Sequence, residues 1–290
     1  MYADLHIHTT ASDGMSTPAE VVAAAKAKGL SAIAITDHDS TDGIAEAIDE
    51  GIKHQIEVIP GIELSTLSGD REIHILGYYP DWKSSLLQEK LAFFIEARQN
   101  RAVKMLEKLD KLGIVVSVQR VEEIAESSFI GRPHIARALL ENGYINEISE
   151  AFTEKYIGRG GRAYVERFKL NPAEGIDMLL KTGAIPVLAH PGNLSQGPPM
   201  LEQEIGSLVV SGLRGIEVYY SRHTAEQKSY YNRIVRTFDL LVTGGSDCHG
   251  YKNSANSLGT VRLPYKYVEA LKSEKIKKHY MAVKNPDIGS

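Results

Sequence analysis

Short apolar stretches and longer amphipathic stretches alternate along most of this chain, and this alternation limits the possible folds more than any other feature. Strands are predicted at residues 32–36, 57–60, 73–78, 184–189, 215–219 and 240–243. Helices are predicted at residues 19–29, about 40–54, 172–182, 201–211 and 224–238, and Ser40, Thr41 and Asp42 offer capping side chains for the second of them. Such alternation favours an α/β protein whose parallel strands are joined by right-handed crossovers.

Residues 83–164 differ from the rest of the chain because nearly all of their signals are helical. They begin with a long amphipathic stretch at residues 86–112, and the glycine-rich segment 158–162 indicates a flexible return. We therefore predict a barrel domain of residues 1–82 and 165–290, and a helical insertion of residues 83–164 that caps the substrate. Beyond Lys272 the sequence predicts a basic helix with a frayed end.

Composition excludes several classes of protein. The 290 residues carry a formal net charge of −4, so no overall positive field would attract nucleic acid, and an anionic substrate would need local arginines or metal ions. The single cysteine, Cys248, excludes an intramolecular disulfide and indicates a reducing compartment. Asp4 and His6 argue against a signal peptide, and no apolar run could span a bilayer. We expect a cytoplasmic monomer that enters no membrane and forms no stable nucleic-acid complex.

The segment His6-Ile7-His8 places two imidazoles on one side of a predicted strand. Side chains at positions i and i+2 of an extended backbone point the same way, so His6 and His8 can converge on one point. Such a pair alone does not specify a metal site, since an isolated histidine at a strand end is usually exposed or hydrogen-bonded. The pair becomes informative only through partners elsewhere in the chain.

Seven further residues with metal-ligand side chains lie at or near the ends of predicted strands. They are Asp13, His38, Glu63, His74, His190, Asp247 and His249. In a barrel of parallel strands the carboxyl ends meet on one face, where catalytic groups gather. With His6 and His8 they make six imidazoles and three carboxylates, a set that is hard to explain as core filling and that predicts a multinuclear metal site. Imidazole and carboxylate ligands without a usable thiolate suit a site for zinc, iron or manganese, and they argue against a cysteine-rich structural zinc site.

These motifs resemble the PHP (polymerase and histidinol phosphatase) family of metal-dependent phosphoesterases, and the resemblance covers nearly the whole chain. It rests on His6-Ile7-His8, Asp13-Gly14, Thr36-Asp37-His38, Gly61-Ile62-Glu63, His74, Ala189-His190-Pro191 and Ser246-Asp247-Cys248-His249. It implies a distorted (β/α)7 TIM-like barrel with three divalent metal ions, which would be Mn²⁺, Fe²⁺ or Zn²⁺, with Mg²⁺ also possible.

The same resemblance implies a division of the nine residues among the three ions. The first ion would be held by His6, His8, Glu63 and Asp247. Glu63 would bridge to a second ion that is also bound by His74 and His190. The third ion would be held by Asp13, His38 and His249.

The helical insertion contains a candidate phosphate site. Arg132 and His134 lie immediately before a predicted helix, and a helix N-terminus with a guanidinium is suited to binding phosphate. Arg159 and Arg162 in the glycine-rich return could add further cationic contacts, and His223 follows a predicted strand that would end at the same mouth. The alternative for any one of these arginines is a solvated surface charge, but Gly131 and Pro133 restrict the approach of Arg132.

Within the PHP family the chain is similar to a subgroup that acts on nucleotides. This subgroup includes 3′,5′-nucleotide bisphosphate phosphatases and RNase AM, a 5′→3′ exoribonuclease of short RNA. Its Gly-Arg-Pro-His element corresponds to residues 131–134. The chain departs from the subgroup at Asn193, a predicted substrate contact, where a basic residue often follows Ala-His-Pro-Gly.

The resemblance and the site together predict a phosphoric ester hydrolase that acts on phosphorylated nucleotides or short 5′-phosphorylated oligoribonucleotides. A metal-activated hydroxide would attack phosphorus in line. Arg132 and His223 would neutralise the developing charge, and either His223 or Asp247 could protonate the leaving oxygen. The alternatives are a phosphomonoesterase of the histidinol-phosphate type, a hydrolase of amides or lactones, and a non-enzymatic PHP accessory module.

Overall fold

A computed structural model describes residues 1–69, 71–125, 130–166, 168, 170–193, 198–250 and 257–284, with side chains as far as residue 277. The chain forms two compact units. The first combines Met1–Gln88 with Lys169–Ser290, and the second is Glu89–Phe168. The second unit covers most of the helical insertion that the sequence predicts at residues 83–164, and its bounds lie a few residues later.

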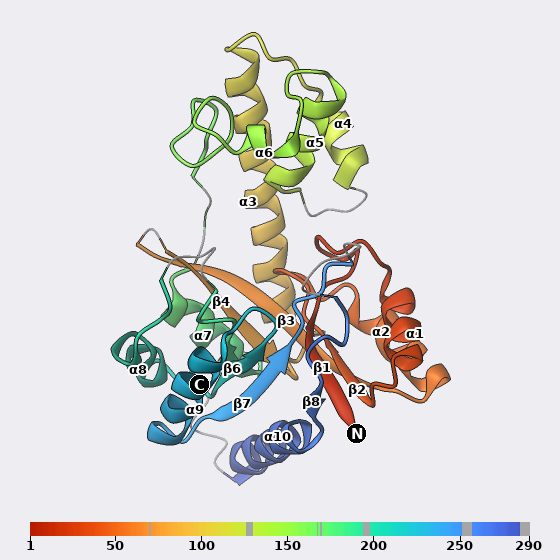
Figure 1. The fold of residues 1–290 in the computed structure, drawn as a ribbon, viewed down its shortest axis with the longest axis vertical. Coiled ribbons are helices and arrows are strands. Elements are labelled where there is room, and N and C mark those ends of the chain that lie inside the picture. Colours follow the sequence, from red (N-terminus) through yellow and green to blue (C-terminus); the bar gives the residue numbers. More distant parts are fainter. Residues whose placement is uncertain are drawn as a thin grey trace. The chain divides into compact units, whose positions relative to one another are not determined.

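The first unit alternates strands and helices, as Figure 1 shows. Its N-terminal half contains β1 (Tyr2–Ile7), α1 (Pro18–Ala27), β2 (Ala32–Ile35), α2 (Ile44–His54), β3 (Glu57–Ser68) and β4 (Arg71–Tyr78). Its C-terminal half contains α7 (Pro172–Lys181), β5 (Ile185–Leu188), α8 (Glu202–Val210), β6 (Gly215–Tyr220), α9 (Ala225–Thr237), β7 (Leu241–Gly245), β8 (Leu263–Pro264) and α10 (Lys266–Lys284).

The eight strands form one sheet in the order β7-β6-β5-β4-β3-β2-β1-β8, which curls until its ends nearly meet. The backbone nitrogen of Asp247, just after β7, donates to the carbonyl of His6 at 2.9 Å. The backbone nitrogen of His8 donates to the carbonyl of Cys248 at the same distance. These bonds join β1 to the end of β7, so the α/β barrel predicted from the sequence is confirmed.

The prediction of a uniformly parallel sheet is wrong at β4, which runs antiparallel to both β3 and β5. The sequence predicts a strand that stops near Pro60, but β3 continues to Ser68 and the chain returns directly as β4. Antiparallel neighbours can be joined by a short turn, whereas parallel neighbours need a crossover of a dozen or more residues. Since no helix separates β3 from β4, the two strands form a hairpin.

A side-chain cap is present at the N-terminus of α1 but not at the N-terminus of α2. Thr17 caps α1 through the backbone nitrogen of Glu20, whose side chain accepts in return from the Thr17 nitrogen. The predicted capping of α2 by Ser40, Thr41 and Asp42 is wrong, because α2 begins after Gly43 and has no side-chain cap. The hydroxyl of Ser40 instead accepts from the Asp42 nitrogen in the turn before the helix.

Helix α10 belongs to the barrel core. The predicted basic helix beyond Lys272 in fact begins at Lys266, and its first turns bury Val268 and Leu271 completely. These side chains pack with strand residues such as Leu5 and Ile185 at the end of the barrel where β1 begins. Burying an aliphatic side chain contributes about 1.5–3 kcal/mol, so α10 supports the barrel. The frayed end was predicted to follow this helix, and residues 285–290 lie outside the described residues.

The second unit is helical. It contains most of α3 (Ser85–Asp110), followed by α4 (Val118–Ala125), α5 (Arg132–Glu141) and α6 (Ile148–Ala151). Its own apolar core includes Leu109, Leu139 and Ile157, which are fully buried. No helix in the described part of the chain has the length and apolar character needed to cross a lipid bilayer.

Candidate metal centre

The first unit brings all nine predicted metal-ligand side chains into one centre, beside the place where the end of β1 meets the end of β7. His6 lies on β1, and His8, Asp13, His38, His190, Asp247 and His249 lie in the segments that follow β1, β2, β5 and β7. Glu63 differs from the prediction because it lies within β3 and not after a strand end, whereas His74 lies within β4, in agreement with the predicted strand at residues 73–78. The hairpin formed by these two strands therefore carries ligands along its length as well as at a strand end.

Glu63 lies at the middle of this centre and is completely buried. One carboxylate oxygen, Oε2, lies within 3.1–3.2 Å of three imidazole nitrogens, those of His6, His8 and His38. The other oxygen, Oε1, lies 2.9 Å from His74 Nδ1 and 3.0 Å from His190 Nε2. One carboxylate thus separates two groups of imidazoles, which is the arrangement expected of a bridging ligand.

Three sets of side chains in the centre could each hold a metal ion, since the ligand atoms within each set lie within 4.8 Å of one another. The sets are His6, His8, Glu63 and Asp247; His38, Glu63 and His74; and His8, Asp13, His38 and His249. The first contains the same residues that the family resemblance implies for one ion. The other two overlap with the implied sets, but they place His8 and His38 each beside two possible ion positions.

The spacing and the hydrogen bonding of these atoms fit bound ions. Two ligands on one tetrahedral ion with bonds of about 2.0–2.2 Å are separated by about 3.3–3.6 Å. His6 Nε2 lies 3.2 Å from Glu63 Oε2 and 3.5 Å from Asp247 Oδ1. Among the described residues, His6 Nε2, His38 Nδ1 and Glu63 Oε2 are buried without a hydrogen bond. Leaving buried polar atoms unsatisfied destabilises a fold, and an ion at this position would satisfy them.

Opposite charges dominate the electrostatics of the centre. Burial alone would lower the pKa of His8 and His74, but the facing carboxylates outweigh burial and raise these pKa values to about 10 and about 9. Burial would raise the pKa of Glu63 and Asp247, and the surrounding imidazoles instead hold both well below their usual range. His38 is the exception, because burial lowers its pKa to about 4. The same carboxylates raise the pKa of His6, so without an ion the protons on His6, His8 and His74 balance the carboxylates.

Comparison with known proteins decides the family. The model of the PHP domain family matches residues 4–175, which include six of the nine ligand residues. The chain belongs to the PHP family. It is 33% identical to the 5′-3′ exoribonuclease Rnm of Escherichia coli over 85% of this chain and 84% of the relative. It is 30% identical to the 3′,5′-nucleoside bisphosphate phosphatase of Chromobacterium violaceum over 88% of this chain and 90% of the relative.

A solved structure supports the same assignment at the level of the fold. A proposed metal-dependent phosphoesterase from Bifidobacterium adolescentis superimposes on this chain with a TM-score of 0.83 and 29% sequence identity. The superposition covers 93% of this chain and 95% of the other. The PHP domain with its insertion is therefore shared along nearly the whole of both chains.

Two residues of β6 that were not predicted from the sequence also reach the metal centre of this PHP domain. Glu217 is fully buried and lies 3.1 Å from His6 Nδ1, and the hydroxyl of Tyr220 donates to Asp247 Oδ2 at 3.1 Å. Glu217 pairs with Thr243 while Tyr219 pairs with Gly244, so β6 has one extra residue between them. A bulge of this kind redirects side chains and is common beside active sites. The only sequence signal was a glutamate inside an otherwise apolar predicted strand.

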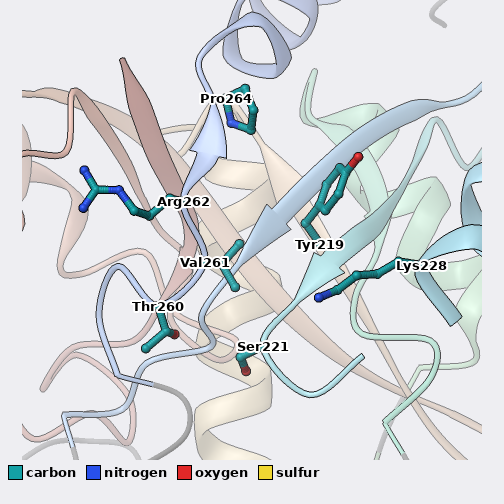
Figure 2. A pocket seen from close by; sticks show the side chains of 7 residues that line it. All are labelled: Tyr219, Ser221, Lys228, Thr260, Val261, Arg262 and Pro264. Atoms are coloured by element: carbon teal, nitrogen blue, oxygen red, sulfur yellow. The ribbon is translucent and has the colours of Figure 1, made fainter. Parts of the chain in front are cut away.

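Tyr219, between these two residues in sequence, has a different environment. Figure 2 shows it lining a separate pocket of about 340 Å³ between β6, α9 and the segment that enters β8. The side chain of Lys228 extends across this pocket, whereas the guanidinium of Arg262 turns away and lies over the ring of Tyr2, 4.9 Å from its centre. The pocket contains none of the nine ligand residues.

Two further buried carboxylates hold the loops that carry ligands. Asp37 accepts hydrogen bonds from the backbone nitrogen and hydroxyl of Thr9 at 2.7 and 2.8 Å, and from the hydroxyl of Ser12 at 2.7 Å. Asp4 accepts from the backbone nitrogens of Ser246 and Gly259, both at 2.8 Å. Burial raises the pKa of Asp4 to about 6. These bonds fix the loop before Asp13 and the turn before Asp247.

The predicted catalytic residue His223 is buried, and both of its ring nitrogens contact the backbone. Its Nδ1 lies 3.0 Å from the carbonyl of Val218, and its Nε2 accepts from the nitrogen of Gly192 at 3.0 Å. Burial lowers the pKa of His223, so the ring is neutral near pH 7. In this arrangement His223 holds the loop after His190, and proton transfer to a substrate would require the Gly192 bond to open. The predicted substrate residue Asn193 lies 3.5 Å from the Tyr220 hydroxyl.

The remaining predicted substrate residues lie in the helical unit. Arg132 opens α5, and His134 Nδ1 accepts from the backbone nitrogen of Gly131 at 3.1 Å. The guanidinium of Arg132 lies 6.0 Å from the ring centre of Tyr164, and that of Arg101 lies 5.5 Å from the same ring. Burial and the nearby Arg132 charge lower the pKa of Arg101. Arg101 was not predicted as a substrate residue, because in the sequence it is an ordinary polar position on a long helix. Arg159 and Arg162 are both exposed.

Proposed function

We propose that this PHP protein is a metal-dependent phosphoesterase that hydrolyses 3′,5′-nucleotide bisphosphates, short 5′-phosphorylated oligoribonucleotides, or both. The observation that carries this proposal is the position of Glu63, whose two oxygens separate two groups of imidazoles at ligand spacing. The names of relatives that are about 30% identical over most of the chain support nucleotides as the substrate class.

The nine residues would hold three divalent ions. His6, His8, Glu63 and Asp247 would bind one, Glu63 with His74 and His190 a second, and Asp13, His38 and His249 a third. Ions of this type lower the pKa of water and withdraw charge from phosphoryl oxygens. The donor set of imidazoles and carboxylates suits Mn²⁺, Fe²⁺ or Zn²⁺.

The side chains of the centre supply orientation and proton acceptors. Tyr220 donates to Oδ2 of Asp247, which leaves Oδ1 facing His6 and His8. Because the imidazoles keep the pKa of Asp247 well below neutral, its carboxylate is suited to accepting a proton from the attacking water. His223 remains the candidate for protonating the leaving oxygen, and it could do so only after releasing the nitrogen of Gly192.

The helical unit is proposed to supply the phosphate contacts and to cap the substrate. Arg132 lies at the N-terminus of α5, where the positive end of the helix dipole and a guanidinium favour an anion. Arg101 shares the Tyr164 ring with Arg132, so two guanidinium groups gather in one region of this unit. Such a pair is suited to a doubly charged phosphate monoester.

Replacing Arg132 with alanine is expected to raise KM for 3′,5′-adenosine bisphosphate by about 10–100-fold with a smaller change in kcat, because a charge-assisted hydrogen bond to phosphate contributes about 1.5–3 kcal/mol. Steady-state kinetics on the metal-loaded protein measure both constants. Arg120→Ala is the matched control, since Arg120 is an exposed arginine of the same unit that pairs with Glu123 and Glu141. Equal KM values for Arg132→Ala and wild type would remove Arg132 from the phosphate site.

The proposed function is tested by a turnover screen of metal-loaded protein. We expect phosphate release from 3′,5′-adenosine bisphosphate, or mononucleotide release from a short 5′-phosphorylated oligoribonucleotide, to exceed turnover of histidinol phosphate. Preference for histidinol phosphate would instead support the phosphomonoesterase alternative. Absence of turnover with every phosphate ester, in protein that binds metal, would contradict the proposal.

A further inference from the structure

We infer that Glu217 is a positioning residue that fixes two of the proposed metal ligands, His6 through its side chain and His190 through its backbone. This inference rests on the proposed function, because it assigns a task to Glu217 within the same centre. Glu217 lies on β6, next to the extra residue of the bulge, and its side chain is completely buried.

The two carboxylate oxygens of Glu217 contact residues from two different strands. Its Oε1 lies 3.1 Å from His6 Nδ1 on β1, and its Oε2 accepts from the backbone nitrogen of His190, just after β5, at 2.8 Å. The rings of these two histidines stack with centres 5.5 Å apart and an interplanar angle of 20°. A single carboxylate thus holds both members of a stacked pair that come from distant parts of the sequence.

The contact with His6 determines which nitrogen of the ring faces the metal centre. A nitrogen beside a carboxylate acceptor carries the proton, so Nδ1 of His6 is the donor and Nε2 is left for an ion. That Nε2 atom lies 3.2 Å from Glu63 Oε2 and has no hydrogen bond among the described residues. Histidines that bind metal commonly donate their second nitrogen to a carboxylate in this way.

The contact with His190 holds an unusual backbone. His190 has a φ of 28°, in the left-handed region that residues with a side chain rarely adopt. Its backbone nitrogen is held by Glu217, and its ring then lies with Nε2 3.0 Å from Glu63 Oε1. Without this bond, relaxation of the backbone would move the ring away from Glu63.

A purely structural explanation does not account for a carboxylate at this position. In the part of the chain that the structure describes, no lysine or arginine lies within ion-pair distance of Glu217, and His6 is its one ionisable partner. Burying a carboxylate is costly unless hydrogen bonds or an opposite charge compensate for it, and the groups that face this carboxylate are the ring of His6 and the backbone nitrogen of His190. Orienting His6 and His190 is the purpose that its two contacts identify.

The test compares the affinity of metal-stripped proteins for Mn²⁺ by titration calorimetry. In Glu217→Gln, the amide has one acceptor oxygen, and its NH₂ group must face one of the two N–H donors. We expect Mn²⁺ affinity to fall about 10–100-fold, the usual effect of losing a carboxylate that orients a ligand, in a variant with an unchanged circular dichroism spectrum. Thr243→Val is the matched control, because Thr243 is the buried cross-strand neighbour of Glu217 and its hydroxyl has no hydrogen bond among the described residues, and it should bind like wild type.

Wild-type affinity in folded Glu217→Gln would overturn the inference while leaving the proposed function intact, whereas a wild type that binds no Mn²⁺ would overturn both. A measurement on the unmodified chain tests the same point if the variant does not fold. Proton–nitrogen correlation spectra of the Zn²⁺-loaded protein should show His6 protonated at Nδ1, with Zn²⁺ on Nε2. Zn²⁺ on Nδ1 of His6 would exclude the proposed role of Glu217.

Discussion

Glu63→Gln is expected to lower kcat/KM for a phosphorylated nucleotide by about 10³-fold or more. Both carboxylate oxygens face imidazole nitrogens at 2.9–3.2 Å, so the substitution weakens the contacts of two proposed ions at once. Each ion contributes several kcal/mol to stabilising charge in the transition state, and a loss of about 4 kcal/mol corresponds to about 10³-fold in rate. Steady-state kinetics with saturating Mn²⁺, together with elemental analysis of the purified variant, measure the effect.

Glu57→Gln provides the matched control, because Glu57 opens the same strand and pairs with Lys272 and Tyr265 away from the centre. This control should keep its metal content and its turnover. If folded Glu63→Gln retained the full metal content and the wild-type kcat/KM, Glu63 would not bridge two ions and the reaction would need a different centre.

The sequence was sufficient for the features that depend on local periodicity or on side-chain type. Predicted helices at residues 172–182 and 224–238 correspond to α7 and α9, and the predicted strand at 215–219 corresponds to β6. The ligand residues were found because imidazoles and carboxylates at strand ends are unusual for a core and typical of a metal site. The structure then places all nine within one centre.

The sequence was insufficient where long-range pairing decides the structure. Residues 57–78 contain apolar and polar positions that also fit two separate parallel strands, and the pairing of β4 with β3 and β5 is what shows that β4 runs the other way. The bulge of β6 depends on its register with β7, so the inward direction of both Glu217 and Tyr220 could not be predicted from alternation. His223 was expected to face substrate, but its ring contacts are with the backbone of Gly192 and Val218.

Metal-stripped protein is expected to lose thermal stability as the pH rises from 7 to 9. Carboxylates raise the pKa of His8 to about 10 and that of His74 to about 9, whereas both titrate near 6.5 in the unfolded chain. Above pH 6.5 the folded form therefore binds more protons than the unfolded form, and the free energy of unfolding falls as pH rises. The contribution of these histidines is complete below pH 6.5 and is lost as pH rises through 9 and 10.

The slope of the free energy of unfolding against pH is bounded by the number of extra protons that the folded form binds. Each histidine that is protonated only in the folded state contributes about 1.4 kcal/mol per pH unit, so His8, His74 and His6, whose pKa is also raised, give at most about 4 kcal/mol per unit. The lowered pKa values of Glu63 and Asp247 do not change this slope, because their contribution is lost only as pH falls into the acidic range. Scanning calorimetry in EDTA at several pH values between 6.5 and 9 measures the trend.

The stabilisation that bound Mn²⁺ gives the folded protein should instead increase as the pH rises. Ions displace the protons from His8 and His74, so metal affinity rises with pH, and bound metal stabilises the fold by an amount that grows with affinity. The difference in Tm between loaded and stripped protein should therefore widen from pH 7 to pH 9. His54→Gln serves as the control, since His54 lies on α2 with 41% of its side chain exposed, and it should keep the wild-type slope. In EDTA, the stability of His74→Gln should fall less steeply with pH than that of wild type. If the Tm difference between loaded and stripped wild-type protein narrowed with rising pH, protons and metal ions would not compete for these imidazoles.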